Sequence, residues 1–433
     1  MSDFSTLSRQ SADLRKKGNL NEALDVFKKL FEGFEADCKE FEWWGYAQCL
    51  LKLDLYQDCL DISGRGLEKF PESGYIKNVH GWALYHVIIK PGPGSNRAAF
   101  FEAARKISEI SKPGDKYSPL NLTALEVIDV LEDNYQENGD TILAWIERMD
   151  VAGLKTETFS FVNEQGRNVE IASQLEKYHT ARVKALYECG HFEKCIAAVA
   201  DAFAAIKAFH YGNDLWLRRY KALSLSETNA MDEALKEYRW ILTRKQDWFL
   251  KKEMAEILME SGNADEALKM ALDASDDPGE ESYKVSLFTM VAQLFKEKGL
   301  MKEAAVHARL SNALRHEKGW QSDPEALEIE AGYAESAQLP SETAALRLLA
   351  EKIWEQWQPS PDRIAGEISR MLPHGNAGFI KGNNGKSYYF KIKDVAEKGL
   401  KIAEGLKVSF VESNSFDPVH NKESVIAVNI RKI

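Results

Sequence analysis

The amino-acid sequence predicts a mostly helical protein built from stacked helix pairs, with a small all-β barrel at its C-terminal end. Three observations predict this fold class. Apolar residues recur at spacings of three and four up to about residue 357, a short phrase recurs about every 35 residues, and apolar and polar residues begin to alternate after residue 371. Charge changes at the same place. Residues 371–433 hold ten Lys and Arg against six Asp and Glu, which leaves 46 against 61 before them.

The recurring phrase is a Gly or polar residue, an apolar residue two positions later and a small residue three positions beyond that. Glycine and asparagine tolerate the left-handed conformation of a tight turn, and a small residue lets two helices approach closely. We therefore expect a turn at each phrase and burial of each small residue. The turn residues are Gly18, Asp54, Gly190, Asn229, Gly262 and Gly299, and the small residues are Ala23, Cys59, Cys195, Ala234, Ala267 and Ala304.

These phrases resemble the tetratricopeptide repeat. The second copy is the clearest, with Trp43 and Tyr46 in a first helix, Tyr56 and Leu67 in a second, and Pro71 at its end. The resemblance is strong at residues 5–71 and 248–310 and weaker around 175–242. It implies a helical solenoid over residues 1–357, whose concave groove receives a protein partner.

The inner face of this groove is expected to carry aromatic, amide and cationic side chains from the first helix of each pair. Its cations would suit an acidic or carboxylate-bearing partner, and ordinary solvated positions are the alternative. These expected groove residues are Trp44, Gln48, Lys52, Lys184, Arg219, Lys252 and Lys296.

The array is irregular between residues 72 and 174. Residues 91–94 alternate Pro and Gly and insert a loop where a tight turn belongs. Residues 156–169 are expected to form an exposed connector. A last helix at residues 341–358, which contains Trp354 and Trp357, is expected to close the stack.

The helical part carries no pattern typical of catalysis or metal binding. Cys189, His191 and Cys195 lie close together, but Cys195 occupies the small buried position of its repeat and His191 lies in the turn. Paired CxxC motifs, HExxH, a glycine-rich phosphate loop and a nucleophile elbow do not occur. We therefore expect a non-enzymatic protein with no catalytic residues, no metal and no cofactor.

Composition predicts a cytoplasmic protein without a membrane partner. No stretch approaches the roughly 18 uninterrupted apolar residues of a membrane helix, and the start has neither the basic flank nor the apolar run of a secretory signal. The five cysteines are odd in number and suit reduced thiols. The oligomeric state stays open.

Residues 358–371 are expected to form a linker and residues 372–433 a small barrel. Four segments there have the alternation of strands: residues 379–381, 388–392, 407–411 and 424–430.

The barrel segment resembles the cold-shock type of OB fold. The family's opening Gly-x-Val/Ile-Lys is similar to residues 378–381, and its Lys-Gly-Phe-Gly-Phe stacking motif to residues 386–390. Its Gly-x-x-Val-x-Phe and Ala-x-Asn-Ile patterns are similar to residues 405–410 and 427–430. Ser387 and Tyr389 replace the glycines of the stacking motif.

This resemblance implies that single-stranded RNA or DNA stacks on the barrel, each stacked base contributing about 1–3 kcal/mol. Alternation places Tyr388 and Phe390 on one face and Tyr389 on the other. The family strand exposes its first and third aromatic, which implies that Tyr388 and Phe390 stack on bases and that Tyr389 lies in the core. The residues expected to bind nucleic acid are Phe379, Lys381, Lys386, Tyr388, Phe390, Lys391 and Lys393.

Two other functions fit the same sequence. The protein could be a purely protein-binding scaffold whose barrel is a docking module. It could also be an accessory subunit of a nucleic-acid-processing or defence system in which another chain performs catalysis.

Overall fold

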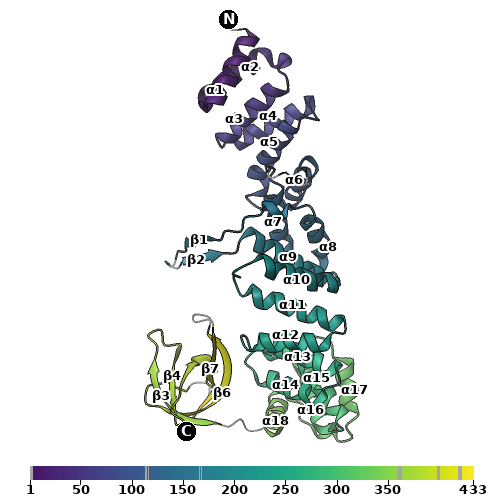
Figure 1. Ribbon diagram of the computed structural model, residues 1–433. Coiled ribbons are helices and arrows are strands. Elements are labelled where there is room, and N and C mark those ends of the chain that lie inside the picture. The colour runs from purple at the N-terminus through teal and green to yellow at the C-terminus, as the bar shows by residue number, and fades with distance from the viewer. Residues whose placement is uncertain are drawn as a thin grey trace. The chain divides into compact units, whose positions relative to one another are not determined.

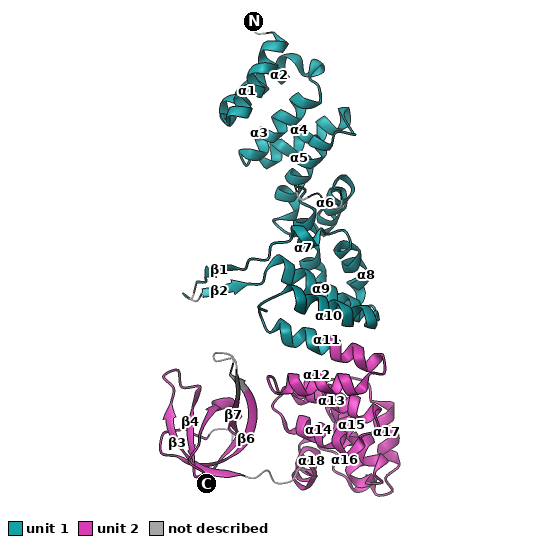
Figure 2. Cartoon of the chain, viewed as in Figure 1, with its two compact units in different colours: residues 1–220 teal, residues 221–433 magenta. Residues whose placement is uncertain are grey.

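The computed structural model describes residues 3–112, 115, 117–164, 166, 168–357, 363–396, 400–417 and 422–433. The chain divides into two compact units, residues 1–220 and 221–433, and the boundary falls within helix α11 (Asn213–Glu227) (Figure 2). The sequence predicts one array over residues 1–357, whereas the later helices and the barrel fall together in the second unit. Each unit contains its own set of helix pairs.

The helices of the first unit follow one another in pairs along the chain (Figure 1). They are α1 (Phe4–Lys17), α2 (Leu20–Phe34), α3 (Glu40–Lys52), α4 (Tyr56–Lys69), α5 (Gly74–Leu84), α6 (Arg97–Ile110), α7 (Leu120–Leu131), α8 (Tyr135–Ile146), α9 (Gln174–Glu188) and α10 (Phe192–Ala205). Those of the second unit are α12 (Met231–Leu242), α13 (Trp248–Glu260), α14 (Ala264–Asp276), α15 (Val285–Glu297), α16 (Met301–Glu317), α17 (Pro324–Ala331) and α18 (Thr343–Trp357). None of the described helices is long and apolar enough to cross a membrane.

The six predicted turns between paired helices are confirmed. Their turn residues all adopt the left-handed conformation, with φ between 59° and 85°. Four are glycines, and Asp54 and Asn229 are residue types that tolerate this conformation. All six small residues are fully buried. The predicted fold class, a mostly α, tetratricopeptide-like array with a C-terminal barrel, is therefore correct.

The small residues are buried because the paired helices nearly touch at these positions. In α4 the thiol of Cys59 donates to the carbonyl oxygen of Ala47 in α3, at 3.3 Å. In α10 the thiol of Cys195 contacts the carbonyl oxygen of Val183 in α9 in the same way, at 3.6 Å. A larger side chain would push the helices apart, which explains the sequence period.

The irregular middle of the array contains a β-hairpin where the sequence suggests only a connector. Strand β1 (Phe159–Val162) pairs with β2 (Asn168–Ile171) in antiparallel register, with Phe161 opposite Val169. Before it, helix α5 continues into a π-helical turn at Tyr85–Ile89 that precedes the Pro-Gly loop.

The last helix, α18, packs against α14 and α16, as its expected closing role requires. Trp354 is buried and its indole Nε1 donates to Nε2 of His307 in α16, at 2.7 Å. The ring of Trp354 also stacks on Phe288, with ring centroids 6.1 Å apart.

The barrel is closed, with strand order β3-β4-β5-β7-β6 (Figure 1). Its strands are β3 (Ile364–Met371), β4 (Ala377–Gly382), β5 (Ser387–Lys391), β6 (Lys407–Asp417) and β7 (Lys422–Lys432). The predicted linker at residues 358–371 is therefore wrong over 364–371, and residues 358–362 lie outside the described part of the chain. The segment 378–381, which the resemblance places at the barrel's opening strand, lies in the second strand, β4.

Candidate functional site

The barrel orients its aromatic strand opposite to the sequence prediction. Tyr388 and Phe390 are 1% and 0% exposed and lie in the barrel core, so they are not available to stack on bases. Tyr389, predicted to be buried, lies half-exposed on the other face. The cause is the register of the β4–β5 hairpin, which places Tyr388 opposite the buried Ile380. Directly paired residues project from the same face of a sheet, so Tyr388 points inward with Ile380.

Tyr388 is held inside by contacts at both ends of its side chain. Its ring lies 4.8 Å from that of Phe410 in β6. Its hydroxyl donates to Glu412 and accepts from Nδ2 of Asn384, the latter at 2.7 Å. Tyr388 is therefore a structural residue of the barrel.

The outer face of β3, β4 and β5 carries a different row of side chains. The register places Arg370 opposite Phe379, and Phe379 opposite Tyr389. The Phe379 and Tyr389 rings are 5.7 Å apart and inclined at 67°. The guanidinium of Arg370 lies 5.3 Å from the centre of the Phe379 ring. Two half-exposed rings and a cation thus lie side by side across three strands, and we call this the Arg370–Phe379–Tyr389 row.

The predicted lysines lie around this row. Lys381 follows Phe379 on the outer face of β4, and Lys391 follows Tyr389 on that of β5; both are exposed. Lys386 lies in the hairpin turn, with Nζ 3.7 Å from Glu412 Oε1. Lys393 is exposed in the short 3₁₀ turn after β5.

Arg370 and Tyr389 are the two residues of the row that the sequence reasoning missed. Arg370 was missed because its strand was assigned to the linker. Tyr389 was missed because family analogy, and not the hairpin register, decided which face of β5 points outward.

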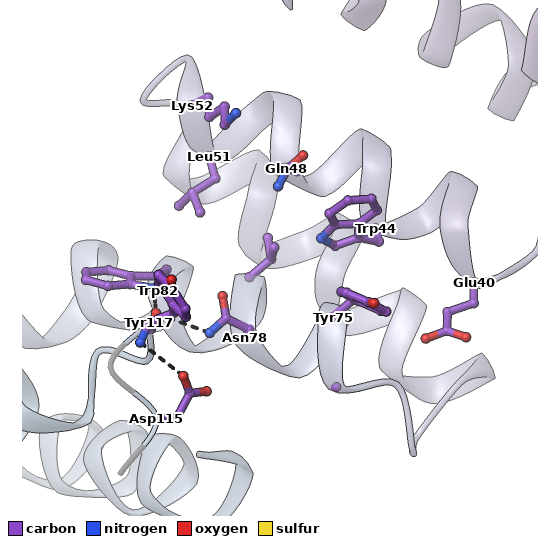
Figure 3. Close-up of a pocket in the computed structure, with 12 residues that line it drawn as sticks. Glu40, Trp44, Gln48, Leu51, Lys52, Tyr75, Asn78, Trp82, Asp115 and Tyr117 are labelled. Atoms are coloured by element: carbon purple, nitrogen blue, oxygen red, sulfur yellow. Dashed lines mark hydrogen bonds between the residues drawn. The ribbon is translucent and has the colours of Figure 1, made fainter. Parts of the chain in front are cut away.

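A second candidate site is a groove in the first unit between α3, α5 and the loop before α7, with a cavity of about 770 Å³. Three predicted groove residues line it, namely Trp44, Gln48 and Lys52 of α3. The sequence reasoning did not include its other main lining residues, Glu40, Tyr75, Asn78, Trp82, Asp115 and Tyr117 (Figure 3).

The remaining predicted groove cations are already engaged within the chain. In the first unit, Nζ of Lys184 lies 5.4 Å from the Tyr135 ring, and the guanidinium of Arg219 lies 5.6 Å from the ring of its neighbour Tyr220. In the second unit, Lys252 is paired with Glu256, and Nζ of Lys296 lies 3.1 Å from Glu328 Oε1. These four residues do not join Trp44 in one described pocket.

The described residues contain no group of three or more His, Cys, Asp or Glu side chains placed to hold a metal ion. Burial raises the pKa of the Cys59 thiol from 9.0 to about 12, which keeps it protonated at neutral pH.

The chain matches no family model, and no curated protein is significantly similar to it in sequence. Solved structures with a similar arrangement include a thermophilic tetratricopeptide-repeat protein of Thermus thermophilus, at 14% identity and a TM-score of 0.22, covering 59% of this chain and 100% of that one. A tetratricopeptide repeat protein from Parabacteroides merdae has 10% identity and a TM-score of 0.28, covering 76% and 97%. The tetratricopeptide domain of P58(IPK) has 14% identity and a TM-score of 0.25, covering 82% and 98%. Likenesses at these values say nothing about a partner or an activity of this chain.

Proposed function

We propose that this protein is a non-enzymatic adaptor, whose helical repeats bind a protein partner and whose barrel binds single-stranded RNA or DNA. The observation that carries the nucleic-acid part is the Arg370–Phe379–Tyr389 row on the outer face of β3, β4 and β5. Flat rings beside cations on a sheet surface are what non-specific single-strand binding requires, because every base has a face that can stack.

We also infer that the barrel is of the cold-shock type. Its five strands form a closed barrel, and an opening Gly-x-Ile pattern occurs at Gly366 and Ile368 in the first strand. In this alignment β4 and β5 supply one stacking ring each, Phe379 and Tyr389. In this alignment the family's opening strand is β3, and residues 378–381 match its second strand.

In this proposal one base stacks on Phe379 and a neighbouring base on Tyr389. The two rings are inclined at 67°, so the bases lie in different planes and the backbone turns between them. Lys381 and Lys391, at the ends of the same outer faces, neutralise phosphates. Glu367, opposite Lys381 in the register, limits how strongly the face attracts phosphate.

The test is binding of a fluorescein-labelled oligothymidylate and an oligouridylate, each of about 12 nucleotides, to the full chain. Phe379→Ala and Tyr389→Ala should each weaken binding by about 1–3 kcal/mol, or roughly 5- to 150-fold in Kd. Arg370→Gln and Lys381→Gln should weaken it and reduce its dependence on salt concentration.

Tyr283→Ala is the matched control, because Tyr283 is an exposed tyrosine of the same unit outside the barrel. It should leave the Kd unchanged. Equal Kd values for the wild type and the Phe379→Ala/Tyr389→Ala double variant would refute the stacking surface and leave the barrel as a protein-docking module.

A further inference from the structure

The groove of the first unit has two aromatic walls with a polar floor between them. Trp44 and Tyr75 form one wall, with ring centroids 5.3 Å apart. Trp82 and Tyr117 form the other, and Asn78 lies between the walls (Figure 3). Tyr75 and Tyr117 are 54% and 68% exposed, and contiguous exposed apolar patches mark interaction sites. Among the described residues, the first unit therefore presents an exposed aromatic surface.

The second wall is fixed in place by hydrogen bonds to one carbonyl oxygen. Trp82 Nε1 donates to the carbonyl oxygen of Tyr117 at 2.7 Å, and Nδ2 of Asn78 donates to the same oxygen at 3.2 Å. Asp115 accepts from the backbone N–H of Tyr117 at 3.0 Å. These bonds hold Tyr117 against α5, so the wall exists before any ligand binds.

Arg15 of α1 holds the first wall in place. Its guanidinium lies 4.3 Å from the centre of the Trp44 ring, and its Nη1 donates to Oε1 of Gln48 at 2.5 Å. This bond occupies the acceptor of the Gln48 amide and leaves the amide nitrogen for a ligand. In Figure 3 the nitrogen of Trp44 lies on the side of its ring nearer Asn78 and Trp82.

The first wall offers hydrogen-bond donors that the chain does not use. Within the described residues, the Trp44 indole N–H, the Gln48 amide N–H₂ and the Tyr75 hydroxyl have no hydrogen-bond partner. A ligand in this groove therefore needs carbonyl acceptors near the rings, since donors that stay unpaired on binding cost free energy.

One cation and two carboxylates line the groove. Lys52 is exposed and has no ion pair among the described residues, and it lies at one end. Glu40 and Asp115 line the same cavity. This excess of carboxylates removes the reason to expect an acidic partner in the groove of the first unit.

We propose that this groove binds a proline-rich segment of the partner protein, in the extended polyproline II conformation. Proline has no backbone N–H, so such a segment presents more acceptors than donors, which matches the donors of Trp44, Gln48 and Tyr75. Its backbone makes no internal hydrogen bonds, so its carbonyls are free, and its rings pack on aromatic walls. The segment is already stiff, so it loses little conformational entropy on binding. This inference rests on the proposed adaptor function and names the class of partner.

The test is fluorescence anisotropy of a fluorescein-labelled peptide of about ten prolines, with the full-length protein and no nucleic acid. A Gly/Ser peptide, a Glu-rich peptide and an amphipathic helical peptide of similar length serve as competitors. The proline peptide should bind at least tenfold more tightly than each of them. Trp44→Ala and Tyr75→Ala should each weaken binding of the proline peptide at least tenfold. Trp44→Phe keeps a ring but loses the N–H, so it should weaken binding about threefold or more.

Trp320→Ala is the matched control, since Trp320 is an exposed tryptophan outside the first unit. It should leave peptide affinity unchanged. Tyr75→Ala should leave oligonucleotide affinity unchanged, so a failure of the groove proposal can be told apart from a failure of nucleic-acid binding by the barrel. Tyr75 is exposed, so its loss should not unfold the helix pair, which a circular dichroism spectrum checks. Preference for the Glu-rich or helical peptide, or equal affinity for Gly/Ser, would overturn the inference, as would unchanged binding by Tyr75→Ala.

Discussion

Replacing Trp354 with phenylalanine should loosen the closing helix α18 from α16. The substitution keeps an aromatic ring next to Phe288 but removes the N–H that donates to Nε2 of His307. His307 is fully buried, and its Nδ1 already donates to the carbonyl oxygen of Glu303, 2.8 Å away. Nε2 would then be a buried acceptor without a partner.

The expected loss has two parts. A buried acceptor left unsatisfied costs about 1–3 kcal/mol. The smaller ring leaves part of the space of Trp354 empty, which adds roughly 1 kcal/mol. The total is about 2–4 kcal/mol, which corresponds to hydrogen exchange that is about 30-fold faster or more.

The assay is native-state hydrogen exchange with mass spectrometry on the full chain. Peptides from α16 and α18 should exchange faster in Trp354→Phe, while peptides from α1 to α4, in the other unit, should not change. Hydrogen exchange reports local opening, so it measures the contact between α16 and α18 separately from the stability of the other helices.

Trp357→Phe is the control on the same helix. Trp357 packs edge-on against Phe295, with centroids 5.4 Å apart, and is only half-buried. Its replacement should cost less than about 1 kcal/mol. The reasoning is refuted if Trp354→Phe and Trp357→Phe accelerate exchange equally, because the buried hydrogen bond would then contribute nothing measurable.

Two further predictions concern pH and the barrel. Burial lowers the pKa of the His80 and His307 imidazoles from 6.5 to about 4, so the unfolded chain binds more protons between these values. The stability they contribute should be complete above pH 6.5 and lost as pH falls towards 4, by about 2–3 kcal/mol per histidine at pH 4.5. Urea unfolding at pH 7.5 and 4.5 measures this loss, and His307→Gln should reduce it by about half, because His80 remains. In the barrel, a Cβ on Gly378 would lie 2.6 Å from the carbonyl oxygen of Arg370, so Gly378→Ala should destabilise β4 by about 1–3 kcal/mol and weaken oligonucleotide binding. Gly74→Ala, where a Cβ meets no atom within 4 Å, should do neither, and equal exchange rates in β4 for Gly378→Ala and wild type would contradict the argument.

The repeat array could be predicted from the sequence because its signals are local. A turn residue with positive φ and a small residue five positions later are both properties of one short segment, as Gly262 and Ala267 show. The same constraint acts in every helix pair, so the pattern repeats and can be recognised without knowing what the pair packs against.

The first barrel strand was not predicted, because a glycine takes the place of an apolar residue on its inner face. Ile364, Gly366 and Ile368 alternate along β3, but a Cβ on Gly366 would lie 2.7 Å from the carbonyl oxygen of Lys381. The close approach of β4 demands glycine there, and glycine gives no apolar signal in the sequence.

The orientation of the aromatic strand was predictable in principle from its turn. Gly382 N–H donates to the carbonyl oxygen of Lys386 at 2.9 Å, which closes a three-residue loop with Gly385 at φ 82°. A three-residue hairpin loop with glycine in the left-handed position sets the register of both strands. That register pairs Phe379 with Tyr389 and turns Tyr388 inward.

The sequence by itself therefore determined the helix pairs, their turns, the presence of a basic β segment and part of each candidate site. That part is Trp44, Gln48 and Lys52 in the groove, and Phe379, Lys381 and Lys391 on the barrel. Only the tertiary structure decided which rings share a surface. Tyr117 reaches the Trp44 groove from a loop about 70 residues away in the chain, and Arg370 reaches Phe379 through strand pairing. Such groupings depend on packing between distant segments, and no local pattern encodes them.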